Sequence, residues 1–172
     1  MLEQLRSAIR DVPDYPKPGI VFKDISTILN NPELYRASIE LMVEPFKGRE
    51  NLYIAGIEAR GFIFGAAMAD RLGAAFVPVR KAGKLPWKTR AVSYALEYGE
   101  DTLEIHVDAI PEGADVVVVD DLLATGGTVG AVLELLETSK VNVIGVSFLV
   151  ELEFLEGRKK LGGAPVHSVL KF

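Results

Sequence analysis

Cysteine is absent from this chain of 172 residues, and histidine occurs only twice. Without cysteine the chain can form neither a disulfide nor a thiolate-bound metal site, a composition that fits a reducing compartment. His106 and His167 are too few for a histidine-rich zinc or iron centre. We therefore expect a cytoplasmic protein without a metal centre of that kind.

Long apolar runs and an excess of positive charge are also missing. No stretch approaches the ~20 apolar residues of a membrane span. The opening residues MLEQLRSAIRDVP lack the basic-then-apolar order of a signal peptide. The formal net charge is −5, so no basic field attracts nucleic acid or an anionic membrane. We expect neither partner, and an anionic ligand must be held by local groups.

The chain does contain an alternation of apolar strands and helical stripes. Runs typical of buried strands occupy residues 52–57, 74–79, 116–119, 141–152 and 166–172. Helical spacing of apolar residues follows at 61–72 and 129–136. This alternation predicts an α/β fold, a central, mostly parallel twisted sheet flanked by helices, in a single domain over 1–172. Ligands of such sheets bind beyond the carboxyl ends of the strands.

The remaining segments have local signals of their own. A short opening helix is predicted to end before Pro13, and Asn31 before Pro32 predicts a second helix that runs toward Phe46. The segment between them, DYPKPGIVFKDIS, is marked by prolines and expected to be irregular. Residues 80–90 read as a cationic loop that is long for a compact domain, and 92–107 as a hairpin turning at Gly99.

The stretch VVVVDDLLATGGT, residues 116–128, places two carboxylates where a buried strand ends. Burying an unpaired charge costs several kcal/mol, so Asp120 and Asp121 are expected to meet a ligand. The small residues that follow let backbone N–H groups approach an anion, and the helix start adds partial positive charge. These residues are Ala124, Thr125, Gly126, Gly127 and Thr128.

The same stretch has two other interpretations. One is a tight turn with N-capping hydroxyls and a solvated acid. The other is the Walker B strand of an NTPase, but the chain contains no G-x-x-x-x-G-K-[ST] motif. The dinucleotide fingerprint G-x-G-x-x-G is missing too. A phosphate cradle one sugar length from two carboxylates favours a ribose 5-phosphate.

VVVVDDLLATGGT resembles the phosphoribosyl pyrophosphate (PRPP) signature of the purine and pyrimidine phosphoribosyltransferases. DYPKPGIVFKDIS, GIEARGFIFG and VSYALEYGEDTLEI resemble further segments of the adenine-specific branch, in the same order and across nearly the whole chain. The resemblance implies the type I phosphoribosyltransferase fold, with a base-recognition segment at 1–30 and a flexible hood at 80–99. It implies a homodimer that transfers 5-phosphoribosyl from PRPP to adenine, giving AMP and pyrophosphate through an oxocarbenium-like transition state. Mg²⁺ would be bound through the pyrophosphate of PRPP rather than by the protein directly.

The resemblance also assigns roles to the two acids and the loops around them. Asp120 and Asp121 would face the ribose hydroxyls, and residues 124–128 would hold the 5-phosphate. The pyrophosphate loop EARG would carry a cis peptide between its first two residues. The residues expected at the pyrophosphate are Glu58, Ala59, Arg60, Gly61, Lys81 and Lys84.

The base and its proton would be handled by two further segments. Glu97 is expected near purine N7 as a catalytic group, with Tyr98 beside it in the hood. Phe22 would stack on adenine, while main-chain groups of Val21 and Lys23 bond its edge. Each role has an alternative interpretation. Glu97 would then be an exposed residue at the edge of a hairpin, and Phe22 an aromatic residue of the core.

Two other functions share parts of this pattern. A xanthine-type phosphoribosyltransferase also combines EARG with the acid–glycine signature. A purine-sensing regulator would keep the fold without catalysis, but such regulators carry an N-terminal DNA-binding domain. Only 13 residues precede DYPKPG, and the charge does not suit DNA. We therefore expect the transferase.

Overall fold

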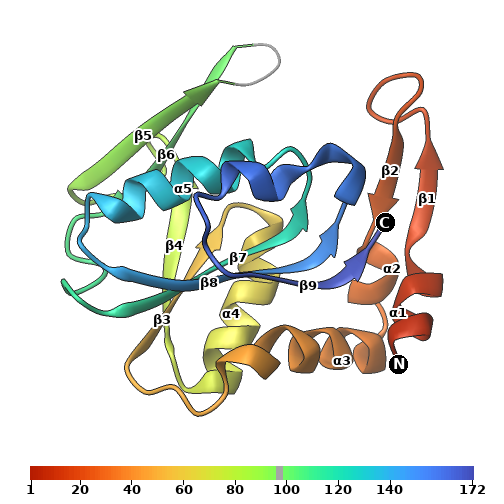
Figure 1. The fold of residues 1–172 in the computed structure, drawn as a ribbon, viewed down its shortest axis with the longest axis horizontal. Helices are drawn as coiled ribbons and strands as arrows, with labels where there is room; N and C mark the ends of the chain where they lie inside the picture. Colours follow the sequence, from red (N-terminus) through yellow and green to blue (C-terminus); the bar gives the residue numbers. More distant parts are fainter. Residues whose placement is uncertain (96–98) are drawn as a thin grey trace. The chain divides into compact units, whose positions relative to one another are not determined.

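The computed structural model describes residues 1–95 and 99–172 (Figure 1). Contacts along the chain divide it into two compact units, Met1–Leu41 and Met42–Phe172. The expectation of one domain over the whole chain stays a prediction. No helix among the described residues is long and apolar enough to cross a membrane.

A seven-stranded sheet forms the larger unit, in the order β5-β6-β4-β3-β7-β8-β9. Two of its strands, β5 (Thr89–Ala95) and β6 (Glu100–His106), form an antiparallel hairpin that joins the sheet at β4. The other five run parallel, as the sequence predicted. They are β3 (Leu52–Ile57), β4 (Ala75–Lys81), β7 (Asp115–Leu123), β8 (Asn142–Glu151) and β9 (Val166–Lys171).

The valine run explains why β7 lies in the middle of this sheet. Val116–Val119 are fully buried, between β3 and β8. The helices α4 (Arg60–Leu72) and α5 (Gly127–Glu137) cover opposite faces of the sheet (Figure 1). A strand covered on both faces buries every side chain, which suits a continuous β-branched run.

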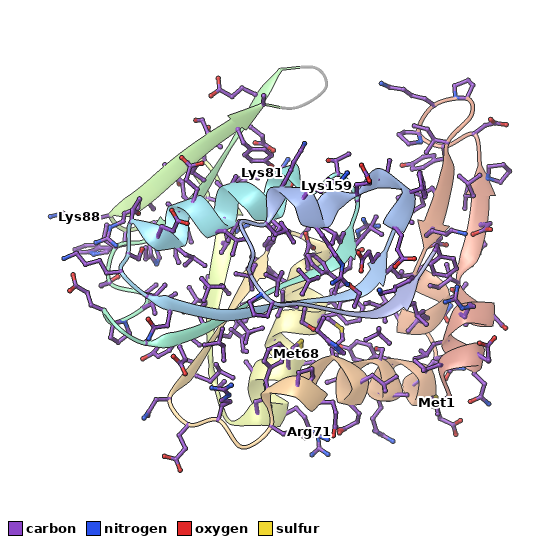
Figure 2. The ribbon with its side chains drawn as sticks, viewed as in Figure 1. Met1, Met68, Arg71, Lys81, Lys88 and Lys159 are labelled. Atoms are coloured by element: carbon purple, nitrogen blue, oxygen red, sulfur yellow. The ribbon has the colours of Figure 1, made fainter. Side chains whose placement is uncertain are left out.

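Helix α4 packs closely on the sheet and ends where the sequence predicted. A Cβ on Gly65 would lie 3.2 Å from the Gly56 Cα, so this pair of glycines allows the helix to approach β3. Met68 is fully buried, whereas Arg71 near the helix end is exposed (both are labelled in Figure 2). Gly73 ends the helix with φ 64°, a left-handed conformation that glycine adopts without strain.

The connection between β4 and β5 differs from the expected loop over residues 80–90. Arg80 and Lys81 still belong to β4, and Thr89 and Arg90 already belong to β5. The cause is backbone pairing with β6, which faces Arg80 with Glu104 and overrides the polar local composition. The hairpin itself is confirmed. The flexibility of the hood stays a prediction.

Short 3₁₀ helices complete the larger unit. The first, η1 (Glu44–Phe46), follows the long helix α3. The other two, η2 (Glu153–Leu155) and η3 (Gly157–Lys160), lie between β8 and β9.

The smaller unit has more regular structure than the sequence indicated. Its elements are α1 (Leu2–Ala8), β1 (Arg10–Pro13), β2 (Val21–Asp24), α2 (Ser26–Leu29) and most of α3 (Pro32–Val43). The irregular segment expected at DYPKPGIVFKDIS was therefore wrong for β2, because the prolines conceal its antiparallel pairing with β1. The cap at Asn31 is confirmed, since its Oδ1 accepts hydrogen bonds from the amides of Glu33 and Leu34, both at 3.1 Å.

Candidate active site

Residues 124–126 form a tight turn between β7 and α5, and Gly127 and Thr128 are the first residues of the helix. Gly126 has φ 79°, again a left-handed conformation that favours glycine. No described side chain caps α5, so the interpretation as a turn with N-capping hydroxyls was wrong. A cavity of about 80 Å³ opens here, lined by Asp120 and residues 122–129. The uncapped start of α5 therefore meets a small open space, where its dipole and amides favour an anion.

The two aspartates at the end of β7 have different surroundings. Asp121 is 4% exposed and lies 3.0 Å from Arg60, Oδ2 to Nε. Asp120 is partly exposed, and its Oδ1 accepts the Asp121 amide at 2.9 Å. Burial raises the pKa of both carboxyls, and the Asp121 charge raises that of Asp120 further, to well above its usual value. The Arg60 charge opposes both shifts without cancelling them.

The EARG loop lies directly beside this acid pair. The Glu58–Ala59 peptide is cis, as expected. A Cβ on Gly61 would come within 2.8 Å of the Val119 carbonyl oxygen and 3.0 Å of Asp120 Oδ1, so only glycine fits there. Because β3 and β7 are parallel neighbours, their carboxyl ends bring the loop and the acids together.

The Glu58 side chain points to the base of the hood. Its Oε2 accepts hydrogen bonds from Arg80 Nε at 3.1 Å and from the Lys81 amide at 3.0 Å. Burial alone would raise the pKa of Glu58, but the Lys81 amide and the Arg80 guanidinium outweigh it, and the pKa is lowered. The Glu58 carboxylate thus fixes the end of β4. An anion at the EARG loop would therefore be bound by the main-chain amides of the loop and not by this side chain.

Two residues that the sequence did not single out extend the site onto the hairpin. Asp101 Oδ2 lies 3.1 Å from Lys81 Nζ, and the hydrogen bond between them raises the pKa of Lys81. Tyr94 pairs with Asp101 across the hairpin, and its hydroxyl accepts a hydrogen bond from Thr128 at 3.4 Å. The sequence did not reveal these two residues because it did not give the register of the hairpin. A turn centred on Gly99 would pair Tyr94 with a residue other than Asp101.

These contacts enclose a cleft of about 400 Å³ in the larger unit. Its lining comes from the EARG loop and the start of α4, from β4, the hairpin and β7, and from the start of α5. The lining residues are Glu58, Ala59, Arg60, Lys81, Tyr94, Asp101, Leu103, Asp120, Asp121 and Thr128. Lys81 (labelled in Figure 2) is thus within the cleft, whereas Lys84 is exposed and does not line it.

Comparison with known proteins identifies the family. A model of the phosphoribosyl transferase domain matches residues 24–161. A protein of Anaeromyxobacter dehalogenans named adenine phosphoribosyltransferase is 54% identical over 172 residues, which is 100% of both chains. This chain belongs to the adenine phosphoribosyltransferase family.

Solved structures of adenine phosphoribosyltransferases have the same fold. That of Thermoanaerobacter pseudethanolicus matches with a TM-score of 0.95 and 52% identity over 100% of each chain. That of Saccharomyces cerevisiae, complexed with an imino-altritol bisphosphate and adenine, matches with a TM-score of 0.93 and 43% identity over 98% of each chain. The family and the type I fold expected from the sequence are therefore confirmed.

The residues expected to bind adenine or to act on it are not among the described residues that line the cleft. Glu97 and Tyr98 fall within residues 96–98, outside the described part of the chain. Val21, Phe22 and Lys23 belong to β2 of the smaller unit. There the Phe22 ring meets the Tyr15 ring edge-on, with 5.2 Å between centroids, and Lys23 Nζ lies 2.6 Å from Asp11 Oδ1. The adenine-related roles stay predictions.

Proposed function

We propose that this chain transfers the 5-phosphoribosyl group of PRPP to adenine, giving AMP and pyrophosphate. The observation that carries this proposal is the relation between the two cavities. The small cavity at the turn and the larger cleft share Asp120 and Thr128. A ligand with a phosphate at one end and a diphosphate at the other would therefore cross the acid pair with its middle part. Ribose is the part of PRPP that lies there.

The acid pair holds and activates the sugar. Two carboxylates accept hydrogen bonds from the 2′ and 3′ hydroxyls, which fixes C1 for in-line attack. As the bond from C1 to the diphosphate oxygen breaks, positive charge develops on the ring, and the nearby carboxylates favour it. The new bond forms between C1 and purine N9. Glu97 takes up the proton that the purine releases, which is the role that we propose for it.

Cations and amides around the EARG loop receive the departing diphosphate. Arg60 and Lys81 both line the cleft, and the Ala59 and Gly61 amides stand at the start of α4, where the helix dipole favours an anion. Arg60 already pairs with Asp121, so the loop that takes the diphosphate is tied to the acid that holds the ribose. Lys84 would join them from the hood.

The donors in the cleft fit a Mg²⁺ ion that arrives with PRPP. Among the described residues no three His, Asp or Glu side chains cluster to hold a metal by themselves. Mg²⁺ commonly binds through substrate phosphates, so the diphosphate of PRPP would hold the ion, and the negative charges of Asp120 and Asp121 in the same cleft would favour a cation. When bound, the ion neutralises charge on the diphosphate and makes it a better leaving group.

Adenine as the base is supported by the relatives and by the chemistry expected of β2. The yeast relative was solved with adenine. Stacking on Phe22 would favour any purine, so the choice must come from the main chain of Val21 and Lys23. A main-chain carbonyl placed to accept a hydrogen bond from N6 of adenine would meet the acceptor O6 of a 6-oxopurine. An amide placed to donate to N1 of adenine would meet a second donor at N1 of a 6-oxopurine. Leaving two buried groups unpaired would lower kcat/KM by orders of magnitude.

The test of the ribose assignment replaces both acids. The double variant Asp120→Asn with Asp121→Asn keeps the side-chain shape and removes both charges. We expect its kcat to fall at least ~10²-fold, because the oxocarbenium ion loses its counter-charges. Asp108→Asn, which neutralises an exposed acid outside the cleft, is the control and should retain activity. Near-normal turnover in a double variant with a native circular dichroism spectrum would refute the assignment.

A further inference from the structure

The segment between β8 and β9 packs its main chain against the phosphate turn. A Cβ on Gly157 would collide with the Ala124 carbonyl oxygen and lie 2.9 Å from Leu123 Cδ1. A Cβ on Gly126 would in turn collide with the Gly157 carbonyl oxygen. Both obstacles are main-chain atoms, which cannot rotate away as a side chain can. The two glycines thus allow a backbone-to-backbone contact that no other residue permits.

The same segment also touches the helix that follows the turn. A Cβ on Gly130 of α5 would lie 3.0 Å from the Lys160 carbonyl oxygen. The Leu152 amide donates a hydrogen bond to the Leu123 carbonyl at 2.9 Å, at the point where β7 ends. Residues 152–161 therefore contact the turn at its beginning, its middle and its exit. We call these residues the brace.

The brace is itself fixed to the sheet by an ion pair. Arg158 Nε and Nη2 lie 2.6 Å from Glu151 Oε1 and Oε2 respectively, a bidentate arrangement that restrains the guanidinium in two directions. Arg158 Nη1 also donates to the Val166 carbonyl at 3.4 Å, which joins the brace to β9. Glu151 is 4% exposed, and the Arg158 hydrogen bond holds its pKa below the usual value.

A hydrophobic anchor holds the other end. Leu161 is 2% exposed and belongs to the core cluster of the larger unit. With Arg158 fixed on one side and Leu161 on the other, Gly157 cannot retreat from the turn. The main chain of the phosphate turn cannot shift toward the brace either, because the Gly157 backbone already contacts it.

We infer that the brace positions the 5-phosphate site, with Gly157 and Arg158 as its positioning residues. Neither residue would touch PRPP. They hold the main chain of residues 124–128 at the spacing that a phosphate requires, as supporting residues do for other anchored groups. This inference rests on the proposed function, since it concerns the phosphate end of the same cleft.

The first test measures the two ends of the site separately. Isothermal titration with ribose 5-phosphate reports the turn, and titration with pyrophosphate plus Mg²⁺ reports the EARG end. We expect Gly157→Ala to weaken ribose 5-phosphate binding about tenfold, because small displacements of binding groups are costly, and to change pyrophosphate binding less than twofold. Gly145→Ala is the matched control, since its Cβ would crowd Phe46 Cε1 at 2.8 Å and should leave both affinities unchanged.

The second test uses the ion pair and does not depend on tolerance of an added methyl group. Arg158→Lys keeps the charge but loses the bidentate geometry. We expect it to raise the KM for PRPP severalfold while kcat and the KM for adenine stay within twofold. Lys159→Ala, which removes an exposed neighbouring charge, should alter none of these values.

The outcomes separate the two proposals. Wild-type protein that fails to bind ribose 5-phosphate would overturn the proposed function together with the brace. Wild-type binding with unchanged affinity in folded Gly157→Ala, or an equal loss for ribose 5-phosphate and pyrophosphate, would overturn the brace alone.

Discussion

Burial and the charge of Asp121 disfavour the ionised form of Asp120, so the pKa of Asp120 lies well above its usual value. A folded state with a raised carboxyl pKa binds the proton more tightly than the unfolded chain does. The resulting stabilisation is complete below the unfolded pKa of about 4 and is lost as pH rises through the folded pKa. At neutral pH the unfolded chain has this acid ionised, so the raised pKa of Asp120 in the folded state lowers the stability of the protein.

Replacing this acid should separate stability from activity. We expect Asp120→Asn to raise the melting temperature at pH 7 by about 2–4 °C, because it removes the disfavoured charge. The gain should shrink as the pH falls toward 4, where the acid is about half protonated in the unfolded chain and its raised pKa costs little stability. Thermal scans from pH 4 to 8 measure this, with exposed Asp108→Asn as the control. A variant less stable than wild type at pH 7 would contradict the conclusion that burial and the Asp121 charge disfavour ionised Asp120.

At the scale of elements, the site depends on how the hairpin lies against β4 and the phosphate turn. Lys81 pairs with Asp101 on β6, and Thr128 donates to Tyr94 on β5. A diphosphate that binds Lys81 must share it with Asp101. The hairpin is thus connected to both ends of the proposed PRPP site.

This arrangement makes one lysine of the hood more important than another. We expect Lys81→Ala to raise the KM for PRPP and the dissociation constant for pyrophosphate about tenfold, because a charge-assisted contact in the cleft is lost. Lys88→Ala, just before β5 and labelled in Figure 2, removes an exposed lysine that does not line the cleft. It should change either constant less than twofold. Equal effects of the two variants would argue for a general electrostatic role of the hood.

The sequence predicted those local structures that are determined by neighbouring residues in the chain. The valine run, the Asn31–Pro32 cap and the Gly73 helix end each depend on a few consecutive residues, and all three are confirmed. The turn at residues 124–126 also follows from neighbouring residues, whereas its role in binding phosphate stays a prediction.

What the sequence could not predict depends on residues that are distant in the chain. Glu58 meets Arg80 across 22 positions, and Gly157 meets the turn only because β8 lies beside β7. Strand β2 was missed for the same reason, since its partner β1 lies beyond a proline-rich connection. Pairing register and backbone contacts of this kind follow from the assembled sheet and not from local composition.

At the scale of the whole molecule, a net charge of −5 must be reconciled with an anionic substrate. Arg60 and Lys81 concentrate positive charge in the cleft, where local potential matters more than the net value. The homodimer that the sequence resemblance implies stays a prediction.

The dimer has a direct test. Sedimentation equilibrium at micromolar protein should give a mass twice that of the 18.7 kDa chain. Repeating the run with PRPP and Mg²⁺ controls for assembly that depends on the ligand. A mass near that of one chain under both conditions would refute the dimer.

Transfer of phosphoribose to adenine can be measured by offering the protein a choice of bases. Purified protein is incubated with PRPP, Mg²⁺ and adenine, hypoxanthine, guanine or xanthine, and nucleotide and pyrophosphate are quantified by chromatography. We expect AMP and pyrophosphate in equal amounts, with kcat/KM for adenine at least ~10²-fold above that for any 6-oxopurine. A comparable kcat/KM for hypoxanthine and adenine would contradict this expectation.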